Sequence, residues 1–483
     1  MNIYTKLSNP VALAVFIFTL TLPILIGFIT RTRTKDQEDF FVGGRKMNKF
    51  IVALSAVSSG RSSWLVLGLS GIAYLRGTGA VWAVVGYIVI ELFQFIYIGR
   101  KLRTETGEYG SLTILDYFET KYKDNSNVIR IIGSLIIAIF MTSYVAAQFN
   151  AGAKALSTAM GLPLILSLII SGLLILVYMI LGGYIAVAYN DVVRAVIMIF
   201  GLVVFPIVGL VRLGGINILL ESLEKLNPAL IDPFSLAFGV FIGYLGIGLG
   251  SPGQPHIVIR YMSIDDPDKL RFASVIGTFW NVIMAWGAIF IGLLGRVLIP
   301  NAADLPGGNH EMVYLVLASD YFGPVLYGLI IGGIFAAILS TADSQLLVVA
   351  STFVRDVYEK IIKKGEMISE EKKLKLSRYV VLLSGIAAMV LAYFAQDYIF
   401  WLVLFAWGGL GASFGTSLIL SLYWNRTTKE GIIAGMITGT IVTIIWKLFI
   451  KSITGIYELI PAFFLSGLAI ILVSVVTGKK ERN

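Results

Sequence analysis

The sequence has no cysteine and only two histidines among its 483 residues. The first absence excludes disulfides and thiolate metal sites, and two histidines are too few for a histidine-rich metal centre. No Gly-Lys-Ser/Thr phosphate-binding motif and no nucleophile–base motif occur, which argues against an ATP-driven pump and against a membrane enzyme. No cleavable signal peptide is expected, because little charge precedes the first apolar run and no small-residue cleavage site follows it.

Charge is scarce as well, because only 14% of the residues are charged, whereas soluble domains carry about 25%. Hydrophobic residues make up 57% of the chain, and the mean hydropathy is +0.84. This composition is typical of a polytopic membrane protein, and the 50 glycines suit close packing of helices in lipid. The net charge of +9 comes from Lys and Arg between apolar runs, so it indicates membrane topology and no nucleic-acid partner.

Apolar runs long enough to cross a bilayer, which takes ~20 residues, recur along the whole chain. About thirteen are expected, near residues 10–30, 50–73, 79–99, 129–157, 161–181, 184–210, 234–257, 273–299, 323–353, 378–396, 399–423, 431–450 and 456–477. Basic residues gather in alternate loops and at the C-terminus, among them Arg31, Arg33, Lys35, Arg260 and Arg482, whereas 301–320 has none. By the positive-inside rule this multi-pass protein of the plasma membrane has its N-terminus outside and its C-terminus in the cytoplasm, as an odd span number requires.

Two of the apolar runs contain helix-breaking sequences. The second run includes Ser-Ser-Gly-Arg-Ser-Ser at 58–63, and the seventh includes Gly-Leu-Gly-Ser-Pro-Gly at 248–253. Inside a helix Gly costs ~1 kcal/mol and Pro ~3 kcal/mol, and irregular backbone at membrane depth is tolerated only where it lines a cavity or packs against protein. Interrupted helices at matching places in two halves are typical of a transporter binding site, although each could also be an ordinary packing kink.

Six short segments then point to a family. They are FFVGGR at 40–45, ALSA at 53–56, LTILDYF at 112–118, GGYIAV at 182–187, GQPH at 253–256 and STADSQLL at 340–347. In this order and spacing they resemble the sodium:solute symporter family, nearest its sodium/proline symporter branch, over about residues 40 to 425.

The resemblance implies an all-α membrane fold of the LeuT type, an inverted repeat of five plus five helices with one leading and two trailing helices. A single transporter domain then occupies residues 1–483. Its expected parts are a leading helix and loop (10–48), a first repeat (49–212), a second repeat (234–425) and the trailing helices (430–477).

An ion site is expected where the ninth run meets the break in the second. Ala337, Ser340, Thr341 and Ser344 recur at helical spacing and share one face, where small hydroxyls serve either as ion ligands or as helix-packing contacts. The resemblance favours ligands. It implies a sodium site made by the carbonyls of Ser58, Arg61 and Ala337 and by the hydroxyls of Ser340 and Thr341.

Two acids fall within apolar runs, Asp191 in the sixth and Asp343 in the ninth. Such an acid is a functional candidate by default, because it costs ~2.5–3.5 kcal/mol at a helix centre, although Asp191 could instead pair with Arg194 at i+3. Some members of the family hold a second sodium with residues matching Asp191, Asp343 and Ser344. A second sodium, a proton or a charge pair all stay open here.

The break in the second run departs from the sodium/proline branch, which has an Asp where this chain has Gly60 and an apolar residue where it has Arg61. Counting ~1.5 Å per residue from the cytoplasmic side puts Arg61 and Asp343 at similar depth. We therefore expect an Arg61–Asp343 pair that weakens sodium dependence. The alternatives are that Arg61 binds a substrate carboxylate or has neither role.

A solute pocket is expected beside the same break. The resemblance implies that Trp64, Gly68 and Tyr144 contribute to it. Two aromatic positions of the sodium/proline branch match Ile247 and Ser251, so the pocket is expected to have lost two rings and proline is less well explained. Gln254 and His256 follow the second break. They either donate to the solute or satisfy the unwound backbone.

These observations predict a secondary transporter that imports a small organic solute, such as proline or a related amino acid, by symport with a cation, chiefly sodium. Proton-coupled or sodium-independent transport is the first alternative. A transporter-like solute sensor is another, but only a few residues follow Thr477, too few for an output domain. The expected partners are the solute and membrane lipid, and the oligomeric state is left open.

Overall fold

The computed structural model describes residues 6–30, 36–179, 183–364, 366, 368–395 and 398–480. Arg31, Arg33, Lys35, Gly182 and Arg482 lie outside these ranges. Within them the secondary structure is helical, apart from an isolated bridge between Met47 and Ile264. The all-α prediction is confirmed.

The chain forms long helices joined by short connections and interrupted by single turns. The first half comprises α1 (Pro10–Thr30), α2 (Gln37–Val42), α3 (Lys49–Gly60), α4 (Ser70–Arg76), α5 (Val81–Phe93), α6 (Arg100–Glu108), α7 (Ile114–Tyr122), α8 (Val128–Met160), α9 (Leu164–Met179), α10 (Tyr184–Ile199), α11 (Phe205–Leu213) and α12 (Ile216–Leu226). The second half comprises α13 (Phe238–Gly246), α14 (Pro255–Met262), α15 (Leu270–Leu298), α16 (Val313–Tyr321), α17 (Pro324–Ser351), α18 (Glu370–Phe394), α19 (Ile399–Leu410), α20 (Thr416–Tyr423), α21 (Lys429–Ile445), α22 (Lys451–Thr454) and α23 (Leu459–Lys480).

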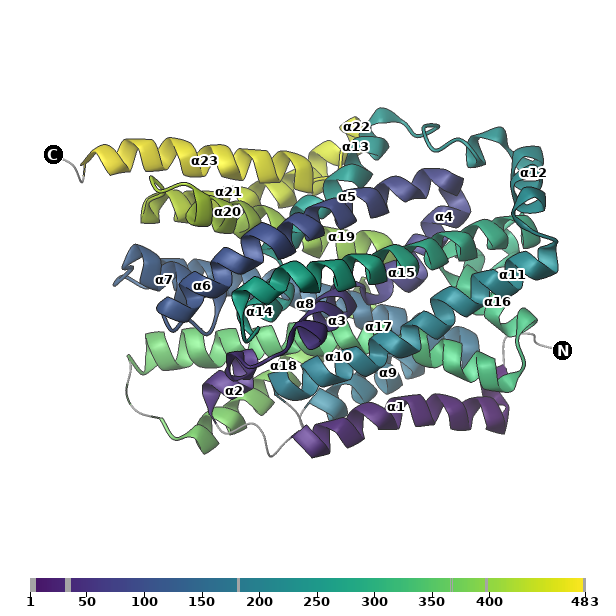
Figure 1. Ribbon diagram of the computed structural model, residues 1–483, viewed down its shortest axis with the longest axis horizontal. Helices are drawn as coiled ribbons and strands as arrows, with labels where there is room; N and C mark the ends of the chain where they lie inside the picture. The colour runs from purple at the N-terminus through teal and green to yellow at the C-terminus, as the bar shows by residue number, and fades with distance from the viewer. Residues whose placement is uncertain are drawn as a thin grey trace.

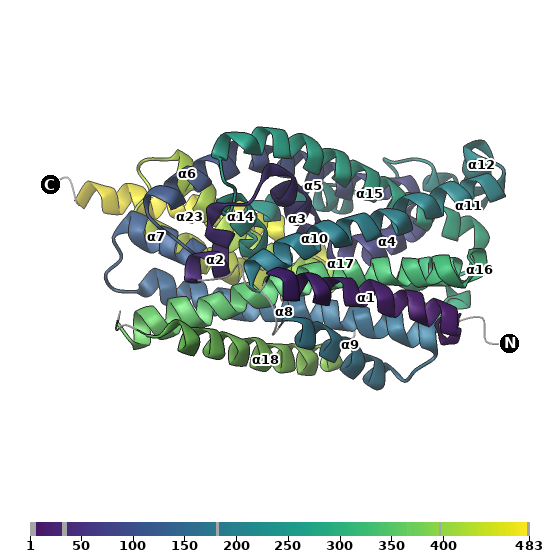
Figure 2. The ribbon, with the colours of Figure 1, turned by 60° about the horizontal axis from the view of Figure 1, so that its bottom comes forward.

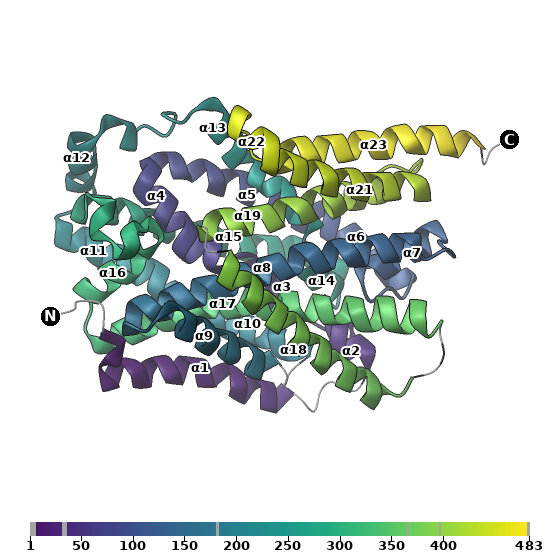
Figure 3. The same cartoon turned by 180° about the vertical axis from the view of Figure 1, so that it is seen from behind.

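The long helices run side by side along the long axis of the molecule (Figure 1). Helix α1 lies at one edge of the bundle, and α21 and α23 lie at the other. Figure 2 and Figure 3 show α8, α9 and α18 on the face opposite α15. Helix α17 runs through the interior, where it is buried along nearly its whole length and packs against α1, α8 and α10.

The two ends of the bundle differ. The start of α1, α12 and α16 lie at one end, whereas α6, α7 and the last turn of α23 lie at the other (Figure 1). Ten helices in the described ranges are long and apolar enough to cross a membrane, and three shorter apolar helices cover Lys49–Gly60, Leu164–Leu176 and Phe238–Gly253. Because these three fall below the ~20 residues that a span needs, the count of thirteen spans stays a prediction.

Both predicted helix breaks are present. Helix α3 ends at Gly60, and Arg61 leaves the helical conformation with φ −100° and ψ 1°. In the second half α13 gives way to a 3-10 turn at Ile247–Gly253, after which Gln254 is extended and α14 begins.

Close backbone approach explains why the second break is rich in glycine. A Cβ atom on Gly253 would lie 2.5 Å from the Leu410 carbonyl oxygen, and one on Gly248 would lie 2.1 Å from that of Gly86. Glycine therefore lets the unwound segment pack directly on neighbouring backbone.

Candidate functional site

The end of α3 meets the hydroxyl-bearing face of α17. The Ser340 hydroxyl donates to the carbonyl oxygens of Ser58 and Ala337, both at 3.1 Å. The Thr341 hydroxyl donates to the Ser59 carbonyl at 2.9 Å. These side chains are fully buried. Four of the five predicted sodium ligands are thus gathered in one place, and Ser59, which the sequence analysis did not select, joins them from the same broken segment.

Arg61, the fifth predicted ligand, contacts this group through its backbone, since its N–H donates to the Ser58 carbonyl at 3.2 Å. Its side chain turns elsewhere. The guanidinium donates to Glu91 at 3.1 Å and to Asn281 at 2.7 Å, and it lies 3.7 Å from the centre of the Tyr87 ring. Glu91 and Asn281 are functional candidates that the sequence analysis missed, although an acid inside the apolar run 79–99 was a visible signal.

The expected Arg61–Asp343 pair is therefore wrong. Asp343 pairs with Arg194, at 2.5 Å between Oδ2 and Nη1. Counting residues from the membrane surface estimates depth along a helix but not the direction in which a side chain points. Arg61 and Asp343 point to different neighbours, and each finds its partner there.

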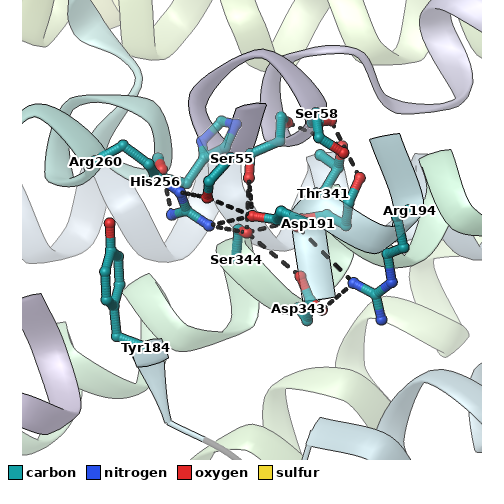
Figure 4. A network of polar contacts seen from close by, with 12 residues as sticks. Ser55, Ser58, Tyr184, Asp191, Arg194, His256, Arg260, Thr341, Asp343 and Ser344 are labelled. Carbon is teal, nitrogen blue, oxygen red and sulfur yellow. Dashed lines mark hydrogen bonds and ion pairs between the residues drawn. The ribbon is translucent and has the colours of Figure 1, made fainter. Parts of the chain in front are cut away.

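Asp191 lies at the centre of a second polar group. Its Oδ2 accepts from the hydroxyls of Ser55 at 2.6 Å and Ser59 at 3.0 Å, and it lies 3.3 Å from the guanidinium of Arg260. Arg260 also donates to the Ser344 hydroxyl at 2.5 Å. Figure 4 shows Arg260 and Arg194 on opposite sides of the two carboxylates of Asp191 and Asp343.

Arg260 was expected among the loop charges, and the structure corrects this. Its side chain is fully buried in α14, where the Tyr184 ring lies 5.3 Å away. Arg260 lies near the end of α14, and its guanidinium reaches inward to Ser344 and Asp191. The i+3 pair of Asp191 with Arg194 is present but long, at 4.0 Å.

A small cavity lies beside Gly60, at the break in α3. Its lining residues are Gly60, Trp64, Tyr87, Tyr144, Ile247, Val403, Leu404 and Trp407. Trp64, Tyr144 and Ile247 are thus brought together as the sequence analysis expected. Their wall is apolar and largely aromatic, which is typical of a small-molecule site.

Two aromatic rings from other helices line this pocket, in place of the two rings that Ile247 and Ser251 lack. Tyr87 of α5 and Trp407 of α19 lie against each other with ring centres 5.5 Å apart, and Trp64 stacks on Tyr87 at 6.3 Å and on Phe400 at 5.8 Å. Gly68 allows this arrangement, because a Cβ there would come within 3.2 Å of Phe400. Tyr87 and Trp407 were not among the expected pocket residues, since only long-range packing brings them to the break.

Ser251 and Gln254 lie outside the lining of this cavity, and both serve the unwound backbone. Gln254 donates to the carbonyls of Gly250 at 3.0 Å and Trp407 at 2.9 Å. The Ser251 hydroxyl donates to Gln94, whose amide returns a bond to the Ser251 carbonyl at 3.3 Å. Of the two roles left open for Gln254, the structure shows the second, in which its amide satisfies carbonyls of the backbone. The His256 ring packs edge-on against Tyr144, with ring centres 5.8 Å apart.

Comparison with known proteins places this geometry in a family. The family model described as "Sodium:solute symporter family" matches residues 40–439. The sodium/proline symporter of Escherichia coli (strain K12) is 34% identical over 97% of this chain and 93% of its own length. The osmoregulated proline transporter OpuE of Bacillus subtilis (strain 168) is 33% identical over 95% and 93%.

The chain belongs to the sodium:solute symporter family. The resemblance drawn from its six segments is confirmed. As a member of this family it is a transporter rather than an enzyme, and the family couples transport of its solutes to sodium.

Solved structures of symporters share the fold. A Na+-coupled sialic acid symporter in a substrate-bound, outward-open state superimposes with a TM-score of 0.82 at 19% identity, covering 96% of this chain and 97% of the other. The nucleobase-cation-symport-1 family transporter Mhp1 superimposes with a TM-score of 0.55 at 14% identity, covering 90% and 95%. These likenesses confirm the LeuT-type fold.

Proposed function

We propose that this symporter imports proline or a closely related amino acid together with sodium. The observation that carries the proposal is the seating of the α17 hydroxyls on the carbonyls at the end of α3. Sodium prefers several oxygen ligands, and unwound backbone with hydroxyls beside it supplies them. We assign the coupling ion to the carbonyls of Ser58, Arg61 and Ala337 and the hydroxyls of Ser340 and Thr341.

On sodium binding, each hydroxyl would turn its proton away from the carbonyl that it now contacts and present an oxygen lone pair to the ion. The ion would then hold the broken helix α3 against α17, one helix from each proposed repeat (49–212 and 234–425). Because the solute cavity begins at Gly60, two residues beyond Ser58, a solute there would feel any movement of the break. This proximity couples the two binding events.

The solute pocket assigned here consists of Trp64, Tyr87, Tyr144, Ile247 and Trp407, with Gly68 behind the rings. The ring of proline is small and apolar, so it suits this aromatic wall. The relatives named as proline transporters support this solute class.

The orientation proposed is N-terminus outside and C-terminus in the cytoplasm. The described parts of the basic loops that follow the first, third, seventh and ninth runs lie towards the end of the bundle where α23 ends (Figure 1). The region 301–320, without Lys or Arg, lies at the other end with the start of α1. The positive-inside rule assigns the basic end to the cytoplasm. An inward sodium ion then gains ~2.3 kcal/mol per 100 mV of inside-negative potential.

The test is uptake of a labelled amino-acid panel, proline included, into proteoliposomes with and without an inward sodium gradient at fixed pH and voltage. We expect proline uptake to require sodium, and both Ser340→Ala and Thr341→Ala to raise the sodium concentration needed. Ser351→Ala is the matched control, because Ser351 lies in α17 as well and its hydroxyl donates to the Val348 carbonyl of its own helix at 2.8 Å. Uptake that ignores sodium would overturn the proposed coupling.

A further inference from the structure

Four fully buried charged side chains lie next to the proposed sodium site. They are Asp191 and Arg194 on α10, Arg260 on α14 and Asp343 on α17, and none is more than 1% exposed. Two carboxylates and two guanidiniums sum to zero. The charges of this cluster are therefore balanced by its own side chains.

Each carboxylate in the cluster has a guanidinium partner. Arg194 lies 2.5 Å from Asp343, and Arg260 lies 3.3 Å from Asp191. Arg194 also approaches Asp191 at 4.0 Å, so the two pairs are linked.

The hydroxyl oxygens around these acids are engaged as well. Ser344 accepts from Arg260 and donates to the Ser340 carbonyl at 2.7 Å. Ser55 accepts from the Nε of Arg260 at 3.2 Å and donates to Asp191 at 2.6 Å. Oδ2 of each acid and the hydroxyls of Ser55 and Ser344 are thus bonded to guanidinium groups. Oδ1 of Asp191 has no hydrogen-bond partner among the described residues and lies 4.0 Å from Nη1 of Arg194.

We propose that Arg194 and Arg260 take the place of a second coupling cation, so that this transporter carries one sodium ion for each solute molecule. The inference rests on the proposed function and specifies its stoichiometry. A sodium ion at these acids would have to displace guanidinium N–H donors from Asp191, Asp343 and Ser344. Three cations would then share two carboxylates at close range, where like charges repel.

The two arginines are tethered cations, which distinguishes them from a bound ion. An arginine keeps its positive charge throughout the physiological pH range, and its rigid planar group matches a carboxylate. The two guanidiniums therefore keep their charge through the transport cycle and are not released on the other side of the membrane, as a bound ion would be. Only the ion at Ser340 and Thr341 couples solute movement to the gradient.

The direct test is the amount of ²²Na+ bound by the purified protein at saturation. We expect one ion per protein chain, and none in the Ser340→Ala/Thr341→Ala variant. Arg194→Gln leaves two acids with one arginine, so it should acquire a second ion. Arg212→Gln is the matched control. Arg212 lies in the same span as Arg194, Tyr184–Leu213, but near its other end, where it donates to the Tyr321 carbonyl.

A second measurement uses the intact wild-type chain. With a tenfold sodium gradient at zero voltage, a one-to-one symporter concentrates labelled proline about tenfold at equilibrium, and a two-to-one symporter about a hundredfold, since the ion gradients multiply. Two bound ions, one of which survives Ser340→Ala/Thr341→Ala, or hundredfold accumulation, would overturn this inference and leave sodium coupling intact. A wild-type protein without sodium binding would instead overturn the proposed function.

Discussion

The guanidinium of Arg61 lies 3.1 Å from the carboxylate of Glu91, and both side chains are buried. Asn281 bonds to both partners, and the Tyr87 hydroxyl reaches Glu91 at 3.3 Å. The break in α3 is thereby tied to α5 and α15. A charge that interrupts a membrane helix is held in place by an acid from the next span.

Removing one partner of this pair should destabilise the protein strongly. A buried charge left without its partner costs about 3–5 kcal/mol, so Arg61→Ala and Glu91→Ala should each lower the thermal unfolding temperature of the purified protein. The double variant Arg61→Met/Glu91→Met should recover most of the loss, because no unpaired charge remains. Thermal unfolding in detergent measures all three.

The exposed pair Arg100–Asp268, at 2.7 Å, is the control for that experiment. Exposed pairs contribute about 0–1 kcal/mol, so Arg100→Ala should hardly change the unfolding temperature. If the Arg61 and Glu91 variants behaved like Arg100→Ala, or if the double variant unfolded lower than both single ones, the pair would not be the anchor described here.

The predicted partner of Arg61 was wrong although the helix break that contains it was predicted correctly. Glycine, proline and serine runs marked both helix breaks correctly, because breaking a helix is a local property. The partner of Arg61 depends on the direction in which the side chain leaves the break. That direction is decided by packing between helices, which no local pattern records.

The aromatic pocket illustrates the same limit. Trp64 follows the break in sequence and was expected in the pocket, whereas Trp407 comes from a helix that starts more than three hundred residues later. Its indole donates to the Ile247 carbonyl at 2.8 Å, inside the second break. Arg260 was misplaced for a related reason, since its position in the sequence does not show that its side chain turns inward to Asp191 and Ser344.

Trp64 should contribute to solute affinity more than to ion binding. Its ring stacks between Tyr87 and Phe400 at the cavity wall, and an aromatic contact adds ~0.5–1.5 kcal/mol beyond buried area. We expect Trp64→Leu to raise the KM for proline about tenfold, which corresponds to ~1.4 kcal/mol, with ²²Na+ binding unchanged.

Trp286→Leu provides the comparison for that variant, because Trp286 is 37% exposed on α15 and lies outside the cavity. An equal rise in KM for both variants, or loss of sodium binding in Trp64→Leu, would contradict a specific role of Trp64 in the solute pocket.

The second break should not tolerate a side chain at Gly253. A methyl group there would lie 2.5 Å from the Leu410 carbonyl and 2.7 Å from the Gly415 nitrogen, both of them backbone atoms. Overpacking of this kind costs typically ~1–3 kcal/mol, so Gly253→Ala should lower the unfolding temperature and impair transport. Gly27→Ala, which meets no atom within 4 Å, should do neither. Comparable transport by both variants would show that the break has room to move.

The segment 310–321 should open more readily as the pH falls, because of His310. This segment contains His310–Met312 and α16, and the His310 ring lies 4.6 Å from that of Tyr398. Burial, with the positive charge of Lys154, lowers the pKa of His310 from 6.5 to about 4. An open segment returns His310 to its ordinary pKa, so protonation favours opening. The closed form loses stability as the pH falls from 6.5 towards 4.

The neighbouring acid Glu311 also titrates, so it has to be replaced by an uncharged residue in this measurement. Burial raises the pKa of Glu311 above 4.5, so a falling pH would favour closure through that residue and oppose His310. We therefore compare Glu311→Gln with Glu311→Gln/His310→Gln. Because the chain has no cysteine, a single Met312→Cys in each background reports opening by its rate of thiol labelling, Met312 being only 2% exposed. The ratio of the two rates at each pH cancels the intrinsic reactivity of the thiol. The labelling rate of the chain that keeps His310, divided by that of the chain with His310→Gln, should rise as the pH falls from 7.5 to 5. A constant ratio would exclude His310 as the titrating group.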